Sequence, residues 1–91
     1  MPGLTGSKPT EFKLYAPSAK KVVLSGSFNK WNIQGFSAKK DFKGNWVAKV
    51  NLKPGKYEYK FFVDGSWVDD PRCTSRVSNA FGTHNCVVEV R

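Results

Sequence analysis

The sequence predicts an all-β fold, an antiparallel β-sandwich built from roughly seven to eight short strands. Three observations predict it. Apolar and polar side chains alternate with a period of two in several segments, and Gly, Pro, Asn and Asp separate these segments. No segment keeps helical periodicity with helix caps over three turns. The length of 91 residues suits one domain with a single core.

The N-terminal end differs in composition from the rest of the chain. Residues 1–9 are rich in Gly and Pro, so we expect a flexible arm there and the sandwich domain over residues 10–91. The arm has no apolar stretch of the kind that a secretory signal needs. No apolar run approaches the ~20 residues of a membrane span. These features predict a cytoplasmic protein with no membrane partner.

The first part of the chain, residues 10–42, is expected to contain three strands and a loop. Residues 10–15 alternate apolar and charged side chains and predict a strand, and residues 20–28 predict a second one. Gly26 lies inside this second strand, where glycine suggests a bend or a close backbone approach. Residues 29–35 contain two Asn and a Gly without alternation and predict a loop. Residues 36–42 predict a short strand.

Two further strands follow, and the second begins a hairpin. Residues 46–52 alternate cleanly, and their inward register contains Trp46, Ala48, Val50 and Leu52. Residues 56–63 alternate as well, with Tyr57, Tyr59 and Phe61 on the core face and Lys60 on the other face. Asp64-Gly65 predicts a tight type I′ turn, since both central residues of that turn need positive φ. The returning limb begins with Ser66 and Trp67.

The C-terminal part is expected to hold a loop and a last strand. Asp69-Asp70-Pro71 ends the returning limb because proline has no N–H to donate. Residues 72–82 are polar and predict a loop. Residues 83–90 predict the final strand.

The net charge of +8 restricts the classes of partner. Of the 15 basic residues, twelve are Lys and three are Arg. Proteins that read nucleic acids lean on Arg for bidentate contacts, whereas Lys-rich surfaces are also typical of solvated faces and protected sheet edges. Charge therefore leaves a nucleic-acid partner open but does not favour it.

Two cysteines, Cys73 and Cys86, cannot form a zinc site alone. A disulfide that closes the short loop between them is possible in an oxidising compartment. We expect two free thiols instead, with Cys86 partly buried as a small hydrophobic side chain.

Catalytic groups are not expected in this sequence. His84 is the one histidine, and no Ser/His/Asp spacing accompanies it. Asp69 and Asp70 are adjacent, and adjacent residues of a strand face opposite ways, so they are not a pair that flanks a substrate. The chain is therefore predicted to be no enzyme, with no cofactor and no metal.

The three tryptophans fall into two classes. Trp46 lies in the inward register of its strand and is expected in the core. Trp31 and Trp67 lie in polar surroundings, where each either folds over the edge of the core or presents an exposed ring to a ligand. A sugar suits such a ring, because its C–H face packs on the aromatic face while Lys and Asn bind its hydroxyl groups. Single-stranded nucleic acid also uses stacking and Lys, and composition does not decide between them.

Four motifs stand in a known order and spacing: SGSFNKW at 25–31, YEYKFFVDGSW at 57–67, DDP at 69–71 and FGTHNCVVEV at 81–90. In these motifs the sequence resembles the family-48 carbohydrate-binding modules, in particular the glycogen-binding domain of AMP-activated protein kinase β subunits. The resemblance extends over nearly the whole chain, roughly from residue 10 to residue 90. It implies an immunoglobulin-like sandwich of the early-set type that binds α-1,4-linked glucans without catalysis.

The resemblance also implies a set of sugar-binding residues. It assigns Trp31 and Trp67 as stacking rings and Lys60 as a donor to sugar hydroxyls. In the family the last motif reads Leu-Gly-Thr-x-Asn, so Thr83 and Asn85 match, while Phe81 replaces Leu. The implied carbohydrate-binding residues are Trp31, Lys60, Trp67, Phe81, Thr83 and Asn85. A catalytic domain or a kinase complex outside this chain is a further partner that the family suggests.

Two other functions remain as alternatives at this point. The first is a basic β domain that binds single-stranded nucleic acid, which would show steep salt dependence. The second is a structural domain that docks onto a glycogen or starch enzyme and has no carbohydrate site of its own. In that case, lysines and loops facing the enzyme would matter more than the tryptophans.

Overall fold

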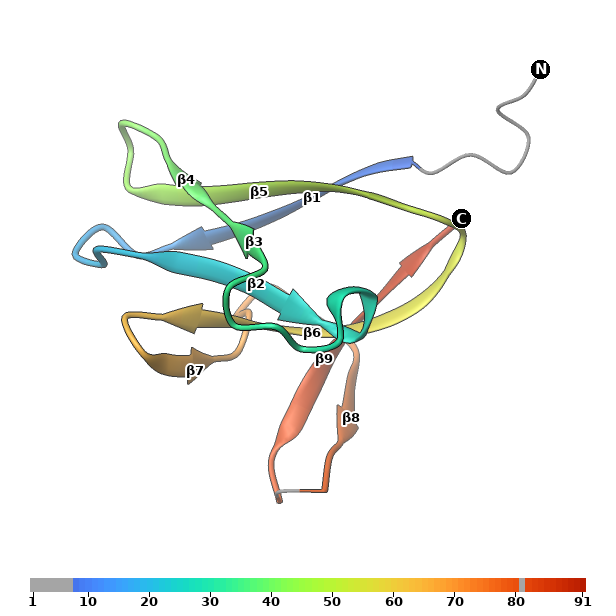
Figure 1. The fold of residues 1–91 in the computed structure, drawn as a ribbon. Coiled ribbons are helices and arrows are strands. Elements are labelled where there is room, and N and C mark those ends of the chain that lie inside the picture. The colour runs from blue at the N-terminus through green and yellow to red at the C-terminus, as the bar shows by residue number, and fades with distance from the viewer. Residues whose placement is uncertain (1–7, 81) are drawn as a thin grey trace.

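The computed structural model describes residues 8–80 and 82–91, and the regular structure in them is almost entirely β (Figure 1). In chain order the elements are β1 (Lys8–Tyr15), β2 (Val22–Gly26), the 3-10 turn η1 (Ser27–Asn29), β3 (Phe36–Ser37), β4 (Lys39–Lys40), β5 (Asn45–Leu52), β6 (Gly55–Val63), β7 (Ser66–Val68), β8 (Arg76–Ser78) and β9 (His84–Val90). The predicted all-β antiparallel sandwich is confirmed, and its immunoglobulin-like type stays a prediction. Residues 1–7 of the expected N-terminal arm lie outside the described residues. Its last two residues, Lys8 and Pro9, belong to β1 and pair with Leu52 and Asn51 of β5.

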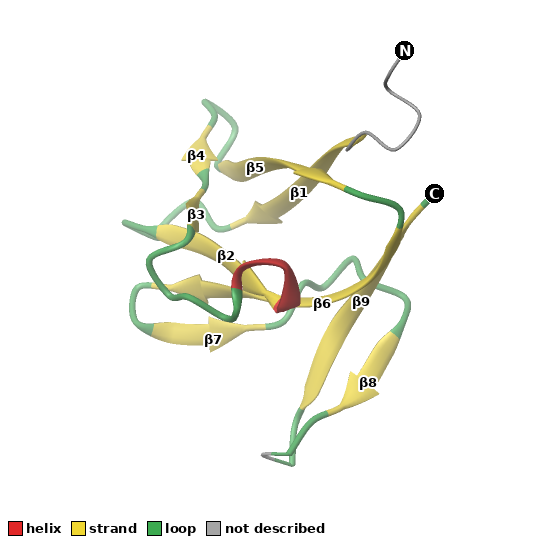
Figure 2. Cartoon of the chain, turned by 45° about the vertical axis from the view of Figure 1, so that its right-hand side comes forward, coloured by secondary structure: helices red, strands yellow, loops and turns green. Residues whose placement is uncertain are grey.

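The strands form two layers, which Figure 2 shows one above the other. One layer is a three-stranded sheet in the order β1-β5-β4, and the other is a six-stranded sheet in the order β3-β2-β6-β9-β8, with β7 also paired to β6. β8 and the first half of β9 form a hairpin whose turn end projects beyond the other strands of the second sheet (Figure 1).

The single strand expected over residues 36–42 is wrong, because this segment crosses from one sheet to the other. β3 pairs with β2, whereas β4 pairs with β5. Ala38 lies between them, is buried, and donates its N–H to the carbonyl oxygen of Val22 at 2.9 Å. The buried crossing residue explains why the segment splits into two short strands.

The core lies between the two layers and uses the predicted inward registers. The inward residues of β5, namely Trp46, Ala48, Val50 and Leu52, are all buried. Phe12 of β1 meets the ring of Tyr59 from β6 edge to face, with ring centroids 4.9 Å apart. Trp46 is buried as predicted and donates its indole N–H to the carbonyl oxygen of Ala16 at 2.8 Å. Burying large side chains of this kind stabilises the fold by about 1.5–3 kcal/mol each.

Strand β6 connects most of the second sheet. One edge pairs with β2. The other edge pairs with β9 over residues 55–59 and with β7 over residues 61–63. Lys60 lies at the point where the pairing partner on this edge changes. Its neighbours Tyr59 and Phe61 are buried, so the period of two points its side chain away from the core.

The predicted Asp64-Gly65 turn is confirmed by positive φ angles of 48° at Asp64 and 89° at Gly65. The Asp64 carboxylate accepts hydrogen bonds from the backbone N–H groups of Lys20 and Lys21, with Oδ1 at 3.0 and 2.8 Å. The turn therefore also fixes the chain just before β2.

Two expectations about residues 72–86 are wrong. The expected loop over residues 72–82 contains the strand β8, which pairs with the first half of β9. Cys73 and Cys86 are joined in a disulfide rather than free. The chain folds back over β9 after Pro71, and the carbonyl oxygen of Ser75 accepts the N–H of Val87 at 2.8 Å, which brings Cys73 to within 6.0 Å of Cys86 between Cα atoms.

Asp70 is the buried carboxylate of this region. Its Oδ2 accepts the hydroxyl proton of Tyr59 at 2.7 Å, and its Oδ1 accepts the N–H of Arg72 at 2.9 Å. Burial, together with the Asp70 carboxylate, raises the pKa of Tyr59 well above its ordinary value. This pair anchors the chain after β7 to the core side of β6.

Candidate functional site

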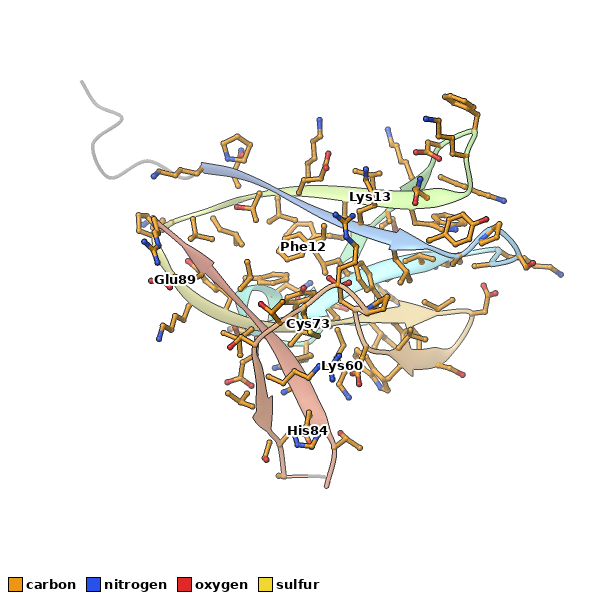
Figure 3. All side chains as sticks on the ribbon, turned by 180° about the vertical axis from the view of Figure 1, so that it is seen from behind. Phe12, Lys13, Lys60, Cys73, His84 and Glu89 are labelled. Carbon is orange, nitrogen blue, oxygen red and sulfur yellow. A yellow bond between two sulfur atoms is a disulfide. The ribbon has the colours of Figure 1, made fainter. Side chains whose placement is uncertain are left out.

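A groove of about 740 Å³ lies on the outer side of the six-stranded sheet, where β6 changes partner. Its lining residues come from four separate segments and are Trp31, Lys60, Trp67, Asp69, Asn79, Thr83 and Asn85. Figure 3 shows Phe12 between the layers and Lys60 on the far side of the second sheet, near the strand that carries His84. The structure thus brings together Trp31, Lys60, Trp67, Thr83 and Asn85, five residues that the sequence singled out.

Phe81 is the sixth carbohydrate-binding residue that the resemblance implies. Phe81 lies outside the described residues, so its role stays a prediction. Gly82, next to it, has a φ of 80°, a conformation that glycine adopts without strain.

The apolar half of the groove is built on the hairpin of β6 and β7. Trp67 pairs across the hairpin with Phe62, and their ring centroids are 4.9 Å apart. The Trp31 ring meets Trp67 edge to face at 6.1 Å with an interplanar angle of 72°. Trp67 is 45% exposed, and Trp31 is partly exposed. The two indoles therefore form a ridge that is supported from below and still open to a ligand.

The turn that presents Trp31 is held by its own hydrogen bonds. Asn29 accepts the N–H of Gly26 at 3.0 Å and donates to the carbonyl oxygen of Leu24 at 3.3 Å. The N–H of Trp31 donates to the carbonyl oxygen of Gly26 at 2.9 Å. Trp31 has a φ of 59°, which costs a residue other than glycine about 1 kcal/mol or more. Such a conformation persists only where its surroundings fix it.

Gly26 is the last residue of β2, directly before this turn, and it pairs with Tyr59 of β6. A Cβ atom there would collide with the carbonyl oxygen of Glu58 and with the ring of Phe28. The close backbone approach predicted for Gly26 is therefore confirmed. The contact fixes the distance between the Trp31 turn and the strand that carries Lys60.

The polar half of the groove centres on Lys60. Its Nζ donates to Thr83 Oγ1 at 3.3 Å and lies 3.6 Å from Asp69 Oδ1. The Lys60 side chain is 12% exposed and that of Asp69 is 48% exposed. The ammonium group is thus held between two elements, with Thr83 on one side and Asp69 on the other.

Asn79 organises the residues of the last motif. Its Nδ2 donates to Thr83 Oγ1 at 2.8 Å and to Asn85 Oδ1 at 3.0 Å, and its Oδ1 accepts the N–H of Thr83 at 3.1 Å. Asn85 is buried and donates from Nδ2 to Glu58 Oε1 at 3.0 Å. The bonds of Asn79 fix the end of the hairpin, and the bond between Asn85 and Glu58 ties it to β6.

Sequence reasoning missed Asn79 and Glu58. It considered Asp69 at the end of the returning limb, in the DDP motif and as a catalytic group, but not as part of the binding site. Asn79 begins the turn in which the N–H of Gly82 donates to its carbonyl oxygen at 3.4 Å, and an Asn followed by a Gly at such a turn is the local signal that could have pointed to it. The contact between Glu58 and Asn85 spans 27 residues and depends on the pairing of β6 with β9. No local pattern carries such a contact.

The groove has little net charge, although the chain carries +8. Among its described lining residues the charged side chains are Lys60 and Asp69, which offset each other. The described residues contain no cluster of His, Cys, Asp and Glu that could hold a metal ion. In the same residues, no helix has the length and apolar character to cross a membrane.

Comparison with known proteins gives a consistent family. The family model described as "Glycogen recognition site of AMP-activated protein kinase" matches residues 8–91. The chain is 38% identical over 85 residues to 5'-AMP-activated protein kinase subunit beta-1 of Rattus norvegicus and to that of Homo sapiens. It is 38% identical over 87 residues to the subunit beta-2 of Mus musculus.

Each of these alignments covers 93% of this chain and 30% of the relative, so the chain spans less than a third of their length. The resemblance that the four motifs suggested is thereby confirmed. The chain belongs to the family of glycogen recognition domains of AMP-activated protein kinase.

Proposed function

We propose that this chain is a non-catalytic module that binds α-1,4-linked glucans, such as glycogen, starch and maltooligosaccharides, in the groove of Trp31, Lys60 and Trp67. The observation that carries the proposal is the convergence of two partly exposed indoles and a nearly charge-neutral polar cluster on one groove. The family to which the chain belongs supports it, because its description names glycogen.

The apolar half of the groove suits the C–H face of glucose. The Trp31 and Trp67 rings stand at 72° to each other, so they offer surfaces of different direction. A glucan chain of α-1,4-linked units curves, and successive sugar faces can pack on rings that are tilted in this way. The Phe62 ring below Trp67 prevents the indole from folding onto the sheet.

The polar half suits the hydroxyl rim of the same sugar. Lys60 has three donors, of which Thr83 takes one and Asp69 attracts another. Thr83 already accepts from Lys60 and Asn79, so its own O–H is available as a donor. With two rings and a few hydrogen bonds, we expect a free energy of binding of about −4 to −8 kcal/mol per site.

Groove charge argues against the nucleic-acid alternative. A groove that follows a phosphate backbone is lined with unpaired cations. Here Lys60 is paired with Asp69, and the described lining residues add no other cation. The docking alternative does not require residues from separate segments to meet in one groove, whereas Trp31, Lys60, Trp67, Thr83 and Asn85, which the resemblance assigns to sugar binding, line the same groove. A catalytic domain or kinase complex outside this chain, and a cytoplasmic location, stay predictions.

Titration with maltoheptaose and β-cyclodextrin at low and high salt tests the proposal, with tryptophan fluorescence as the signal. We expect saturable changes with both sugars and an affinity that barely responds to salt, because no counterions are released. An unchanged spectrum with both sugars contradicts the proposal. Saturable binding of a single-stranded oligonucleotide with steep salt dependence supports the alternative.

The variant Trp67→Ala assigns the site. Calorimetry should show maltoheptaose affinity lowered by about tenfold or more, since the substitution removes the apolar surface on which the C–H face of a glucose unit packs. The control is Phe42→Ala, which removes a ring that is 94% exposed and lies outside the groove. Affinity should be unchanged in this control. Parent-like binding by Trp67→Ala would remove Trp67 from the site.

A further inference from the structure

Asp69 and Asp70 are neighbours in the chain with opposite environments. Asp70 is buried and accepts the hydroxyl proton of Tyr59 and the N–H of Arg72. Asp69 lines the groove, and its side chain is 48% exposed. The chain thus directs the carboxylate of Asp70 into the fold and that of Asp69 into the groove.

The hydrogen-bond acceptors of the polar half are mostly in use. Thr83 Oγ1 accepts from Lys60 at 3.3 Å and from Asn79 at 2.8 Å, which fills both of its lone pairs. Asn85 Oδ1 accepts from Asn79 at 3.0 Å. The Asp69 carboxylate has about four acceptor positions, and its contact with Lys60 at 3.6 Å is an ion pair longer than a hydrogen bond. Asp69 is therefore the strongest acceptor that this part of the groove can offer.

We propose that Asp69 is a ligand-binding residue that makes the groove selective for neutral glucans over phosphorylated ones. This inference rests on the proposed function. A sugar hydroxyl can accept from Lys60 and at the same time donate its proton to Asp69, so the ion pair matches a group that is both donor and acceptor. A phosphate group has acceptors to offer and carries negative charge, so it meets Lys60 favourably but is repelled by Asp69.

The charge balance of the groove determines that neutral glucans, and not phosphorylated ones, are preferred. Without Asp69, Lys60 would be an unpaired cation beside two aromatic rings, and such a site favours anions. With Asp69, the local charges cancel and the anion gains little from Lys60 while it approaches a carboxylate. Selectivity that arises from charge is screened by salt, so it should shrink as the ionic strength rises.

Three ligands distinguish charge from size: maltoheptaose, maltoheptaose phosphorylated at one 6-hydroxyl, and maltoheptaose methylated at the same 6-hydroxyl. Calorimetry on the parent chain should show the phosphorylated ligand bound about tenfold more weakly than the methylated one at low salt, and less than that at high salt. Equal affinity of the parent for these two ligands overturns the inference.

The variant Asp69→Asn keeps one acceptor oxygen and removes the charge. We expect its affinity for maltoheptaose to stay within about threefold of the parent, and its preference against the phosphorylated ligand to disappear. Asp69→Ala also removes the acceptor, so its affinity for maltoheptaose should fall by about tenfold. Unchanged selectivity in Asp69→Asn, or parent-like maltoheptaose affinity in Asp69→Ala, overturns the inference.

The matched control is Glu89→Gln, which removes an exposed carboxylate of β9 that does not line the groove. It changes the net charge by the same amount and should leave selectivity unchanged. Thermal melting verifies that all three variants fold. If maltoheptaose does not bind the parent, both proposals fail. If it binds and selectivity is independent of Asp69, the proposed function stands and the inference about Asp69 fails.

Discussion

The two faces of β6 differ in what their side chains contact. On the inner face, Tyr59 and Phe61 are 4% and 0% exposed, and their contacts lie within the fold. On the outer face, Lys60 and Phe62 support a groove that is open to a ligand. One strand with a period of two therefore separates stability from binding, and adjacent residues should respond very differently to substitution.

The same contrast holds for the tryptophans. Trp46 is 8% exposed, and its indole N–H is paired with the carbonyl oxygen of Ala16. Trp67 is 45% exposed and rests on Phe62. A tryptophan with a satisfied N–H inside the core belongs to the fold, whereas one supported from below and open above is suited to stacking.

Phe61→Ala should have the largest effect, and that effect should be on stability. Phe61 is fully buried among core side chains, so the cavity should lower the free energy of unfolding by about 3–5 kcal/mol. Urea unfolding followed by circular dichroism measures it. The control on the opposite face, Lys60→Met, should change stability by less than about 1 kcal/mol and weaken maltoheptaose binding. A similar loss of stability in both variants would contradict the division between the two faces.

Tyr59→Phe tests the inner face through its pH dependence. The substitution leaves Asp70 Oδ2 without the donor that it has at 2.7 Å, which should lower stability by about 1–2 kcal/mol near neutral pH. Burial and Asp70 raise the pKa of Tyr59 in the folded chain above the model-peptide value of 10.0. The stabilisation is therefore complete below about pH 10 and is lost as the pH rises further, because the unfolded chain ionises first.

Urea unfolding of the parent and of Tyr59→Phe between about pH 8 and pH 11 provides the measurement. The difference in unfolding free energy should be constant up to about pH 10 and shrink above it. Other groups that titrate in this range are common to both chains and cancel in the difference. A gap that widens above pH 10 would show that Tyr59 does not hold its proton in the folded chain.

Much of the inner face could be predicted from the sequence because its signals are local. The alternation of residues 46–52 predicted the buried residues of β5, and Asp64-Gly65 predicted the turn. Lys60 was placed on the outer face by the same period of two. The convergence of Trp31, Lys60, Trp67, Thr83 and Asn85 followed from the resemblance, since no local pattern brings these segments together.

What the sequence did not predict depends on distant contacts. β8 consists of the exposed residues Arg76–Ser78, and pairing with β9 rather than its own pattern makes it a strand. The disulfide depends on the return of the chain after Pro71. In β2, Val22, Val23, Leu24 and Ser25 are all buried, although neighbouring side chains of a strand point to opposite faces. β2 is an inner strand of the sheet, and both of its faces are covered.

Asn79→Ala should have the smallest of these effects, and it should appear in binding. Asn79 holds Thr83 and Asn85 through three hydrogen bonds, so its loss should let both side chains rotate and weaken maltoheptaose binding by about three- to tenfold. Because Asn79→Ala removes the hydrogen bond from Asn79 Nδ2 to Thr83 Oγ1, part of the loss of maltoheptaose affinity should arise from a changed orientation of Thr83.

A double-mutant cycle with Thr83→Val isolates that part. If Asn79 acts by orienting Thr83, the double variant should have about the same maltoheptaose affinity as whichever of Asn79→Ala and Thr83→Val has the lower affinity. Losses that add in full would show that Asn79 and Thr83 act independently. Asn79→Gln provides the comparison at the same position. Its side chain is one methylene longer, so its amide cannot keep all the hydrogen bonds of Asn79 and should restore only part of the affinity. Thermal melting should change little in each variant, since Asn79 lies on the outer hairpin and supports the groove rather than the core.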